Sequence, residues 1–324
     1  MTVQQLATMA DPEADRLRRE GATFIAGGTD LLQLMQEQVA SPTALLDLSP
    51  LGLTGVAEDL SGLRIGALSR LADVAEDPLV RDRLPVVRQA LLETASHQVR
   101  NMATVGGNLL QRTRCLYFRD AATPCNKRVP GSGCPAQDGR NRMNAIFGGS
   151  PHCIAVQPSD LAVALVALDA EVILDADGSE RSLAVAALHR LPEDRPDIET
   201  ALQPGEIITS VWVPAPAPDT HMAYVKVRDR ASFEWALTSC AAVIRLEADR
   251  VAEARIAVGG VATKPWRLPA LEEALRGRRL DSDTIAAVSA RAAEGAQPRG
   301  DNAFKVELLQ RTVAQALIEI GEQP

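Results

Sequence analysis

Aromatic residues are scarce in this sequence: phenylalanine, tryptophan and tyrosine together make up 3% of its 324 residues. Stacking platforms for bases or sugars need several such rings, so a single-strand nucleic-acid binder is not expected. Basic residues are also outnumbered, because 34 lysines and arginines face 42 aspartates and glutamates, which gives a formal net charge of -8. An acidic chain binds a phosphate backbone poorly, and nucleic acid is therefore excluded as a partner.

Long apolar runs are absent as well. The longest, residues 161–168, is bounded by Asp160 and Asp169 and falls far short of the roughly 20 residues that span a bilayer. Residues 1–12 lack a basic stretch followed by an apolar core, so no signal peptide is expected. The sequence predicts a chain without membrane insertion that is cytoplasmic as synthesised. Export to the periplasm together with a signal-bearing partner stays open.

Close cysteine pairs of the Cys-x-x-Cys type are missing, although the chain has five cysteines. Four of them fall in one window, and the fifth lies far away in an apolar stretch: Cys115, Cys125, Cys134, Cys153 and Cys240. An odd, clustered set argues against a disulfide framework and favours metal or redox chemistry in that window. The isolated Cys240 is expected to be a buried packing residue.

The hydrophobic pattern of the first part of the chain predicts a compact βαβ unit. A charged helix at 11–20 is followed by a short strand at 23–26, a helix at 30–38 and a strand at 45–48. In the next part, Ser69 is placed to cap a helix and Pro85 to start another. An apolar helix at 161–168, a hairpin turn at Asp177-Gly178 and a strand at 207–213 follow, each with its usual signals. These elements predict an N-terminal domain in two parts.

The stretch 214–218, with three prolines in five residues, is the clearest linker in the chain. Strands are expected beyond it near 223–227, 236–246 and 255–258. The last helix, at 304–320, carries apolar residues three or four positions apart. The fold class expected from this order is α+β, with a smaller α+β domain at the C-terminus.

Two glycine pairs are the first candidates for a ligand site. Gly27-Gly28 lies between a strand and a helix, and Gly106-Gly107 is flanked by Thr104 and Asn108. Bare backbone N–H groups at such turns bind phosphate or pyrophosphate well. Neither pair belongs to a G-x-G-x-x-G or Walker motif, and each alone reads as an ordinary tight turn. Two separate turns indicate a long ligand that is held at two places, such as a dinucleotide.

Longer stretches around these glycines follow one another in a specific order. They are AGGTDLLQLM (26–35), ASHQVRNMATVGGNLLQ (95–111), PSDLAVALVALDAEV (158–172), LQPGEIITSVWVP (202–214), YVKVRDRASFEWALTSCAAVI (224–244) and VGGVATKPWRLPALEEAL (258–275). Together they resemble the FAD-binding medium subunit of the molybdenum hydroxylases, the family that includes xanthine dehydrogenase and carbon monoxide dehydrogenase. The resemblance covers nearly the whole chain.

The resemblance implies a two-part FAD-binding domain of the VAO/PCMH-like type at 1–215, with parts at about 1–58 and 59–215, and a C-terminal domain at 219–324. It implies that both glycine turns hold the FAD pyrophosphate, and that three further side chains contact the ribityl, ribose or flavin end. The implied FAD-binding residues are Ala26, Gly27, Gly28, Thr29, Asp30, Leu31, Ser96, Thr104, Gly107, Asn108, Asp160 and Lys226. No residue of this chain is assigned a catalytic role beyond electron transfer through FAD.

Residues 112–153, which contain the four clustered cysteines, form a long segment rich in glycine, proline, asparagine and arginine. A loop of this length needs something to order it, and four thiolates around one metal centre would do so. Seven arginines and lysines face two aspartates here, an excess of five positive charges that would stabilise an anionic [4Fe-4S] cluster. Structural zinc and a basic, partner-facing loop with free thiols stay open as alternatives.

The same segment resembles an insert in the FAD subunit of bacterial periplasmic-type aldehyde oxidoreductases, especially at CLYFRD (115–120) and NKRVPGSGC (126–134). This resemblance implies that Cys115, Cys125, Cys134 and Cys153 hold a [4Fe-4S] cluster. His152 is the alternative to Cys153, the cysteine that lies furthest from the others along the chain.

The resemblance further implies a role in a larger oxidoreductase complex, a heterotrimer or its dimer. A molybdopterin-binding large subunit would oxidise an aldehyde, a [2Fe-2S] small subunit would pass electrons to FAD, and an external acceptor would take them. The alternatives are a complex of the 4-hydroxybenzoyl-CoA reductase type, with electrons running the opposite way, and a stand-alone flavoprotein oxidase. A binding or assembly module with structural zinc would be a protein of another class.

Overall fold

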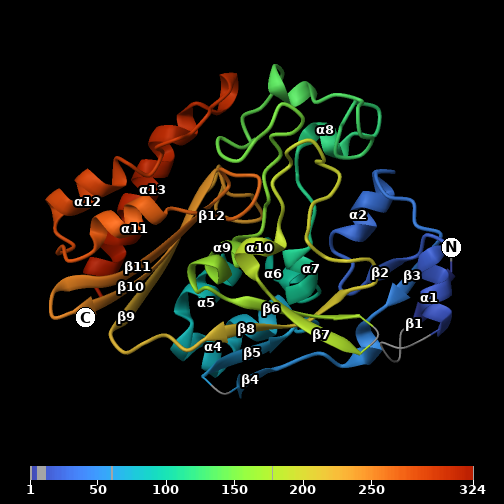
Figure 1. Ribbon diagram of the computed structural model, residues 1–324, viewed down its shortest axis with the longest axis horizontal. Helices are drawn as coiled ribbons and strands as arrows, with labels where there is room; N and C mark the ends of the chain where they lie inside the picture. Colours follow the sequence, from blue (N-terminus) through green and yellow to red (C-terminus); the bar gives the residue numbers. More distant parts are fainter. Residues whose placement is uncertain (1, 6–11, 60, 177, 324) are drawn as a thin grey trace.

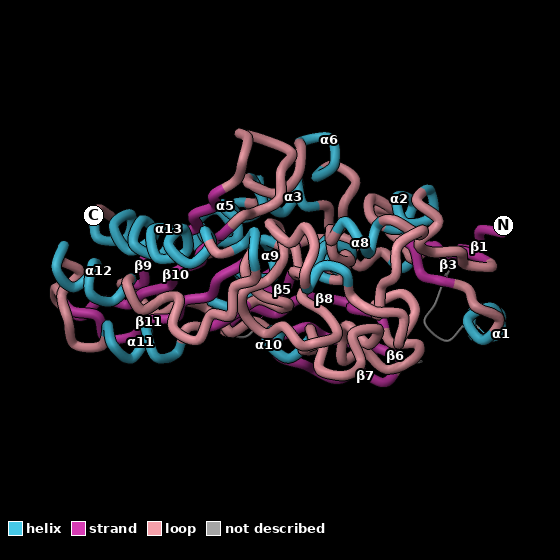
Figure 2. The backbone as a smooth tube through the Cα atoms, turned by 90° about the horizontal axis from the view of Figure 1, so that it is seen from above, coloured by secondary structure: helices cyan, strands magenta, loops and turns pink. Residues whose placement is uncertain are grey.

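The computed structural model describes residues 2–5, 12–59, 61–176 and 178–323. Within these residues, three β-sheets lie one after another along the long axis of the molecule (Figure 1). The smallest sheet lies near the N-terminus at one end, and the C-terminal sheet with its helices lies at the other (Figure 2). The mixed helix and sheet content is that of the predicted α+β class.

The first sheet is parallel, with the strand order β1-β3-β2: β1 (Thr2–Gln5), β3 (Ala44–Asp47) and β2 (Thr23–Ile25). Helices α1 (Pro12–Arg19) and α2 (Leu31–Gln36) connect the strands. The βαβ unit predicted from the sequence is confirmed, although its second helix is shorter than expected. Residue 11 of the predicted first helix lies outside the described residues. The core of this small unit is the fully buried Leu46.

The second sheet is antiparallel, in the order β4-β5-β8-β6-β7, and forms the body of the N-terminal domain. Its strands are β4 (Val56–Asp59), β5 (Gly62–Gly66), β8 (Ile207–Pro214), β6 (Glu171–Ala176) and β7 (Ser179–Ala184). β6 and β7 pair as the predicted hairpin; Asp177 of its turn lies outside the described residues. Its helices are α3 (Leu71–Glu76), α4 (Pro78–Arg83), α5 (Pro85–Leu92), α6 (His97–Arg100), α7 (Val105–Leu109), α9 (Asp160–Ala167) and α10 (Val185–Leu188).

One capping prediction is wrong. Arg70, not Ser69, occupies the N-cap of α3, and the Ser69 hydroxyl instead bonds to the backbone of Gly55. Pro85 begins α5 as predicted. Strand β4 begins at Val56 and pairs within the second sheet, so the expected limit near residue 58 falls inside this strand. The domain limits 1–215 and 219–324 stay a prediction.

The third sheet is antiparallel and consists of β9 (Thr220–Val227), β10 (Thr238–Glu247), β11 (Arg250–Gly259) and β12 (Trp266–Arg267). Alternate residues of β10 face opposite sides, as strand geometry requires. Ala241 and Val243 pack into the core of the N-terminal domain, whereas Cys240 and Ala242 pack toward α13 (Phe304–Gly321). Cys240 is fully buried, which confirms its packing role. Helices α11 (Pro269–Leu275) and α12 (Ser282–Ser289) complete this domain.

The cysteine segment rises from the body of the molecule as a loop with little regular structure (Figure 1). It contains one short helix, α8 (Leu116–Arg119), and the single turn η2 (Pro135–Gln137) within its described residues. Like η2, the segments η1 (Ser49–Leu51) and η3 (Gly300–Asn302) are single turns of 3₁₀ helix. Among the described residues, no helix is both long and apolar enough to cross a membrane.

Candidate functional site

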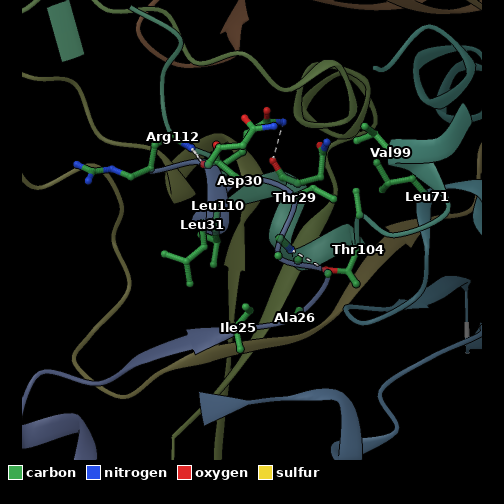
Figure 3. A pocket seen from close by; sticks show the side chains of 18 of the residues that line it. Ile25, Ala26, Thr29, Asp30, Leu31, Leu71, Val99, Thr104, Leu110 and Arg112 are labelled. Atoms are coloured by element: carbon green, nitrogen blue, oxygen red, sulfur yellow. Dashed lines mark hydrogen bonds between the residues drawn. The ribbon is translucent and has the colours of Figure 1, made fainter. Parts of the chain in front are cut away.

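A cavity of about 540 Å³ lies where the first sheet meets the body of the N-terminal domain. Both glycine turns contribute to its wall, together with the loop that precedes β10. Nine of the twelve predicted FAD-binding residues line it: Ala26, Gly27, Gly28, Thr29, Asp30, Leu31, Thr104, Gly107 and Asn108. Figure 3 shows several of them around the cavity. The structure therefore brings together two turns that are about 80 residues apart in sequence.

The first turn needs both of its glycines. Gly28 has a φ of 70°, a left-handed conformation that side chains with a Cβ rarely adopt. A Cβ on Gly27 would overlap the carbonyl oxygen of Met102, just ahead of the second turn. The two turns thus approach each other closely only because Gly27 has no side chain.

The second glycine pair, predicted as a turn, lies in the first turn of helix α7, which Thr104 caps. The hydroxyl of Thr104 accepts a hydrogen bond of 3.3 Å from the N–H of Gly107, which Figure 3 marks. A Cβ on Gly107 would lie 2.9 Å from this hydroxyl, so a larger residue here would displace the Thr104 side chain. Asn108 is buried and accepts a bond of 2.6 Å from the Ser159 hydroxyl. The backbone N–H groups of residues 105–108 all bond within the chain, so this glycine pair lets a ligand approach the start of α7 closely but offers it no free N–H donor.

Asp30 bonds to the cysteine segment. Its carboxylate accepts a bond of 2.8 Å from the N–H of Arg112, which Figure 3 shows, and forms ion pairs with Arg114 at 2.8 Å and Arg119 at 2.7 Å. Burial lowers the pKa of Arg114 to about 10, which still leaves it charged at neutral pH. Its guanidinium also stacks on the ring of Trp235 at 4.4 Å. No sequence pattern pointed to these arginines as partners of the first turn.

Three of the predicted FAD-binding residues lie outside the cavity lining: Ser96, Asp160 and Lys226. The Ser96 hydroxyl caps α6 by accepting a bond from Val99. Asp160 and Lys226 form an ion pair of 2.8 Å in which both side chains are at least 96% buried.

Tyr224 donates a further bond of 2.7 Å to the Asp160 carboxylate. Burial, together with this carboxylate, raises the pKa of the tyrosine well above its usual range, so it remains a neutral donor. The bonds of Asp160 to Lys226 and Tyr224 join α9 to β9, and thus the N-terminal domain to the third sheet.

The cavity also has residues that sequence reasoning missed. Four of them lie in the loop between β9 and β10: Arg230, Phe233, Glu234 and Trp235. All four lie in a stretch that carried the family resemblance, but nothing in their spacing indicated a ligand. Phe233 has a φ of 52°, and its N–H bonds to the carbonyl of Ala95, which also lines the cavity.

The four clustered cysteines converge in space. Cys115, Cys125, Cys134 and Cys153 all line one small cavity, and His152 lies at the same cavity. The Cys153 sulfur accepts a bond of 3.4 Å from the N–H of Ala155, and the Cys115 sulfur one of 3.6 Å from the Asn144 amide. None of the four is in a disulfide.

Burial dominates the electrostatics of these thiols. It raises the pKa of Cys153 to about 12, although the charge of Lys127 acts in the opposite direction. The pKa of Cys134 is raised by burial and by the neighbouring Cys115. Among the described residues, no three histidine, cysteine or acidic side chains are close enough to hold a single metal ion. The structure shows four thiols around one cavity, and the [4Fe-4S] cluster itself stays a prediction.

Arginine and asparagine side chains order the loop around these cysteines. Arg128 donates to the carbonyls of Tyr117 and Phe118 at 2.9 and 2.7 Å. The Asn126 amide donates to the carbonyl of His152 and its oxygen accepts from Gly133. Part of the basic excess in this segment therefore satisfies backbone carbonyls that the irregular loop leaves unpaired.

Comparison with known proteins identifies the family of the chain. Residues 2–216 match the FAD binding domain of molybdopterin dehydrogenases, and residues 223–320 match the C-terminal domain of the carbon monoxide dehydrogenase flavoprotein. Together the two matches span most of the chain. The chain therefore belongs to the family of FAD-binding medium subunits of the molybdenum hydroxylases, and it is an oxidoreductase subunit.

Individual relatives narrow the comparison. The chain is 46% identical to the aldehyde oxidoreductase FAD-binding subunit PaoB of Escherichia coli, over 99% of this chain and 98% of that protein. It is 27% identical to the glyceraldehyde dehydrogenase medium chain of Sulfolobus acidocaldarius, over 92% and 90% of the two chains. Among solved structures, carbon monoxide dehydrogenase from Hydrogenophaga pseudoflava matches with a TM-score of 0.76 at 25% identity, over 99% of this chain and 96% of that one.

Proposed function

We propose that this chain is the FAD-binding electron-transfer subunit of a molybdenum-containing aldehyde oxidoreductase. The observation that carries the proposal is that both glycine turns line one cavity. The choice of aldehydes is supported by the 46% identity to an aldehyde oxidoreductase FAD-binding subunit along almost the full length of both chains. Bound FAD would accept and release electrons, and the chain's own residues would bind, orient and shield it.

The nine predicted residues that line the cavity are assigned to the FAD pyrophosphate and its surroundings. Ser96, Asp160 and Lys226 support that site from behind: Ser96 caps the helix that supplies Val99 to the lining, and the Asp160–Lys226 pair fixes the domain junction. These three would act on FAD through the wall that they hold in place.

The cysteine segment is proposed to hold a [4Fe-4S] cluster through Cys115, Cys125, Cys134 and Cys153. Support comes from the cavity that all four line and from the hydrogen-bond donors to the sulfurs of Cys115 and Cys153. The four thiolate ligands of a [4Fe-4S] cluster must meet at one place, as these four cysteines do. Donors of this kind stabilise thiolate ligands.

The proposed partners are a molybdopterin-binding large subunit and a [2Fe-2S] small subunit, assembled as a heterotrimer or its dimer, with an external electron acceptor. Several relatives are medium chains or medium subunits of larger enzymes, which supports assembly of this chain with other subunits. In this assembly the present chain would not bind the organic substrate.

The FAD site is tested with Gly107→Val in the full chain, and Gly300→Val is the matched control because nothing lies within 4 Å of a Cβ at that position. We expect Gly107→Val to weaken FAD binding by at least about ten-fold, since the new side chain enters the cavity. Fluorescence titration with FAD measures the affinity. Equal FAD affinity in both variants would overturn the placement of FAD at this turn.

The cluster is tested with Cys125→Ser against Cys240→Ala, which removes the cysteine that packs behind β10. Iron and acid-labile sulfide are measured after anaerobic purification. We expect Cys125→Ser to lose most of both and Cys240→Ala to keep them. Iron bound equally by both variants would contradict the ligand assignment, and zinc in place of iron would favour the structural alternative.

The direction of electron flow is tested in the assembled complex by mixing it anaerobically with an aldehyde. Bleaching of the flavin absorbance supports the proposal. Bleaching by aldehyde in this chain alone would instead indicate a stand-alone oxidase, and flavin oxidation by an aromatic acyl-CoA would indicate the reductase type.

A further inference from the structure

The carboxylate of Asp30 connects the proposed FAD site to the cysteine segment. Asp30 occupies the N-cap of α2, yet its side chain makes no capping bond to that helix. An aspartate at this position ordinarily accepts a bond from the second or third N–H of its helix. Here the carboxylate turns to the cysteine segment and accepts from Arg112, Arg114 and Arg119.

The contacts with Asp30 are largely shielded from water. The side chains of Asp30, Arg114 and Arg119 are 15%, 20% and 11% exposed. Charge-assisted bonds in such surroundings are stronger and less screened than surface ion pairs. By contrast, the ion pair between Arg142 of the segment and Asp229 is about half exposed on both sides.

The arginines also fix the first of the clustered cysteines. Arg114 directly precedes Cys115, which is the N-cap of the short helix α8, and Arg119 is the last residue of that helix. Arg119 also donates to the carbonyl of Thr113, which lies just before Cys115. One guanidinium therefore bonds both to Asp30 and to the backbone beside Cys115. Moving Cys115 would therefore displace the groups that hold Asp30.

We propose that Asp30 is a positioning residue that makes the geometry of the first glycine turn depend on the ordered cysteine segment. The inference rests on the proposed function, because it takes this turn as the FAD site. It assigns Arg119 an effect on FAD although Arg119 lies outside the cavity lining. A carboxylate that acted only by touching FAD would give Arg119 no such effect.

The test compares Arg119→Gln, Asp30→Asn, the double variant and the control Asp229→Asn in the full chain. FAD affinity is measured by fluorescence titration, and backbone order at residues 26–31 by amide hydrogen exchange in cofactor-free protein. We expect each of the first two variants to weaken FAD binding by about ten-fold or more, the double variant to be far from additive, and Asp229→Asn to stay within about two-fold. Exchange at 26–31 should rise in Arg119→Gln.

The outcomes separate this inference from the function on which it rests. If the unaltered chain fails to bind FAD, the proposed function fails, while faster exchange at 26–31 in Arg119→Gln still supports the coupling. If the unaltered chain binds FAD but Arg119→Gln matches it in affinity and exchange, the coupling is overturned and the FAD site stands. Should Arg119→Gln unfold, Arg119→Met takes its place because it keeps the aliphatic stem and removes every donor to Asp30, and unchanged affinity and exchange in that folded variant would overturn the coupling.

Discussion

The residues that the sequence assigns to FAD divide into a group that lines the cavity and a group behind it. The first group consists of the residues in and beside the two glycine pairs, which line the cavity. The second consists of Ser96, Asp160 and Lys226, which cap a helix or form a buried ion pair. Motif resemblance selected both groups alike, so a matching motif marks residues that build the wall as well as residues that face the ligand.

The largest expected effect concerns Lys226 in the group behind the cavity. Lys226→Met leaves the Asp160 carboxylate buried without its cation, and breaking a buried pair in this way costs about 3–5 kcal/mol of folding free energy. Denaturant unfolding measures the loss of stability. The control is the same substitution at a surface lysine, Lys264→Met. A loss below about 1 kcal/mol would show that the pair is not a structural element of the junction.

His189 extends the comparison to pH, because it lies behind the second glycine turn and bonds to the carbonyl of Leu109 at 2.8 Å. Burial lowers its pKa from 6.5 to about 4. The unfolded chain therefore binds a proton that the folded chain does not, and stability is lost as the pH falls from about 6.5 to about 4.

The contribution of His189 to this loss is about 2–3 kcal/mol. Unfolding free energies at pH 7, 5.5 and 4.5 measure it, and His189→Gln should flatten the slope while keeping a donor toward Leu109. An unchanged slope in His189→Gln would assign the acid sensitivity to other groups.

Gly27 represents the lining group. Gly27→Ala forces the first turn away from the carbonyl of Met102, which we expect to cost about 1–3 kcal/mol and to abolish FAD binding. Its ratio of lost FAD affinity to lost stability should exceed that of Lys226→Met. FAD titration of both folded variants gives this ratio, and equal ratios would remove the distinction between the two groups.

The smallest expected effect is that of Ser96→Ala. Loss of the cap on α6 costs about 1 kcal/mol, and FAD affinity should change by less than about three-fold. Thermal unfolding and FAD titration provide the two values. A large loss of FAD affinity without loss of stability would return Ser96 to the group that contacts the ligand.

Local signals explain how much could be predicted. The Gly27-Gly28 turn, the helix start at Pro85 and the burial of Cys240 depend on a few neighbouring residues, and the structure confirms those features. The second glycine pair, Gly106-Gly107, lies within helix α7 and not in a turn. The partners of Ser69 and Asp30 could not be read in this way. Ser69 bonds 14 residues away at Gly55, and Asp30 bonds about 80 residues away at the arginines of the cysteine segment. Pairings over such distances are decided by packing, which no spacing rule encodes.

The convergence of the four cysteines is an intermediate case. Their clustering in sequence indicated a shared site, and the structure places all four at one cavity. What the spacing could not indicate is the framework of Arg128 and Asn126, which bond to the backbone carbonyls and N–H groups of this irregular loop.

The most direct test of the account is the cofactor content of the anaerobically purified full chain. The account predicts about one FAD, about four iron and about four acid-labile sulfide per chain, with an EPR signal after reduction by dithionite. FAD without iron would retain the FAD site and contradict the cluster. Iron without FAD in a folded chain would contradict the central claim that this is a flavin-binding electron-transfer subunit.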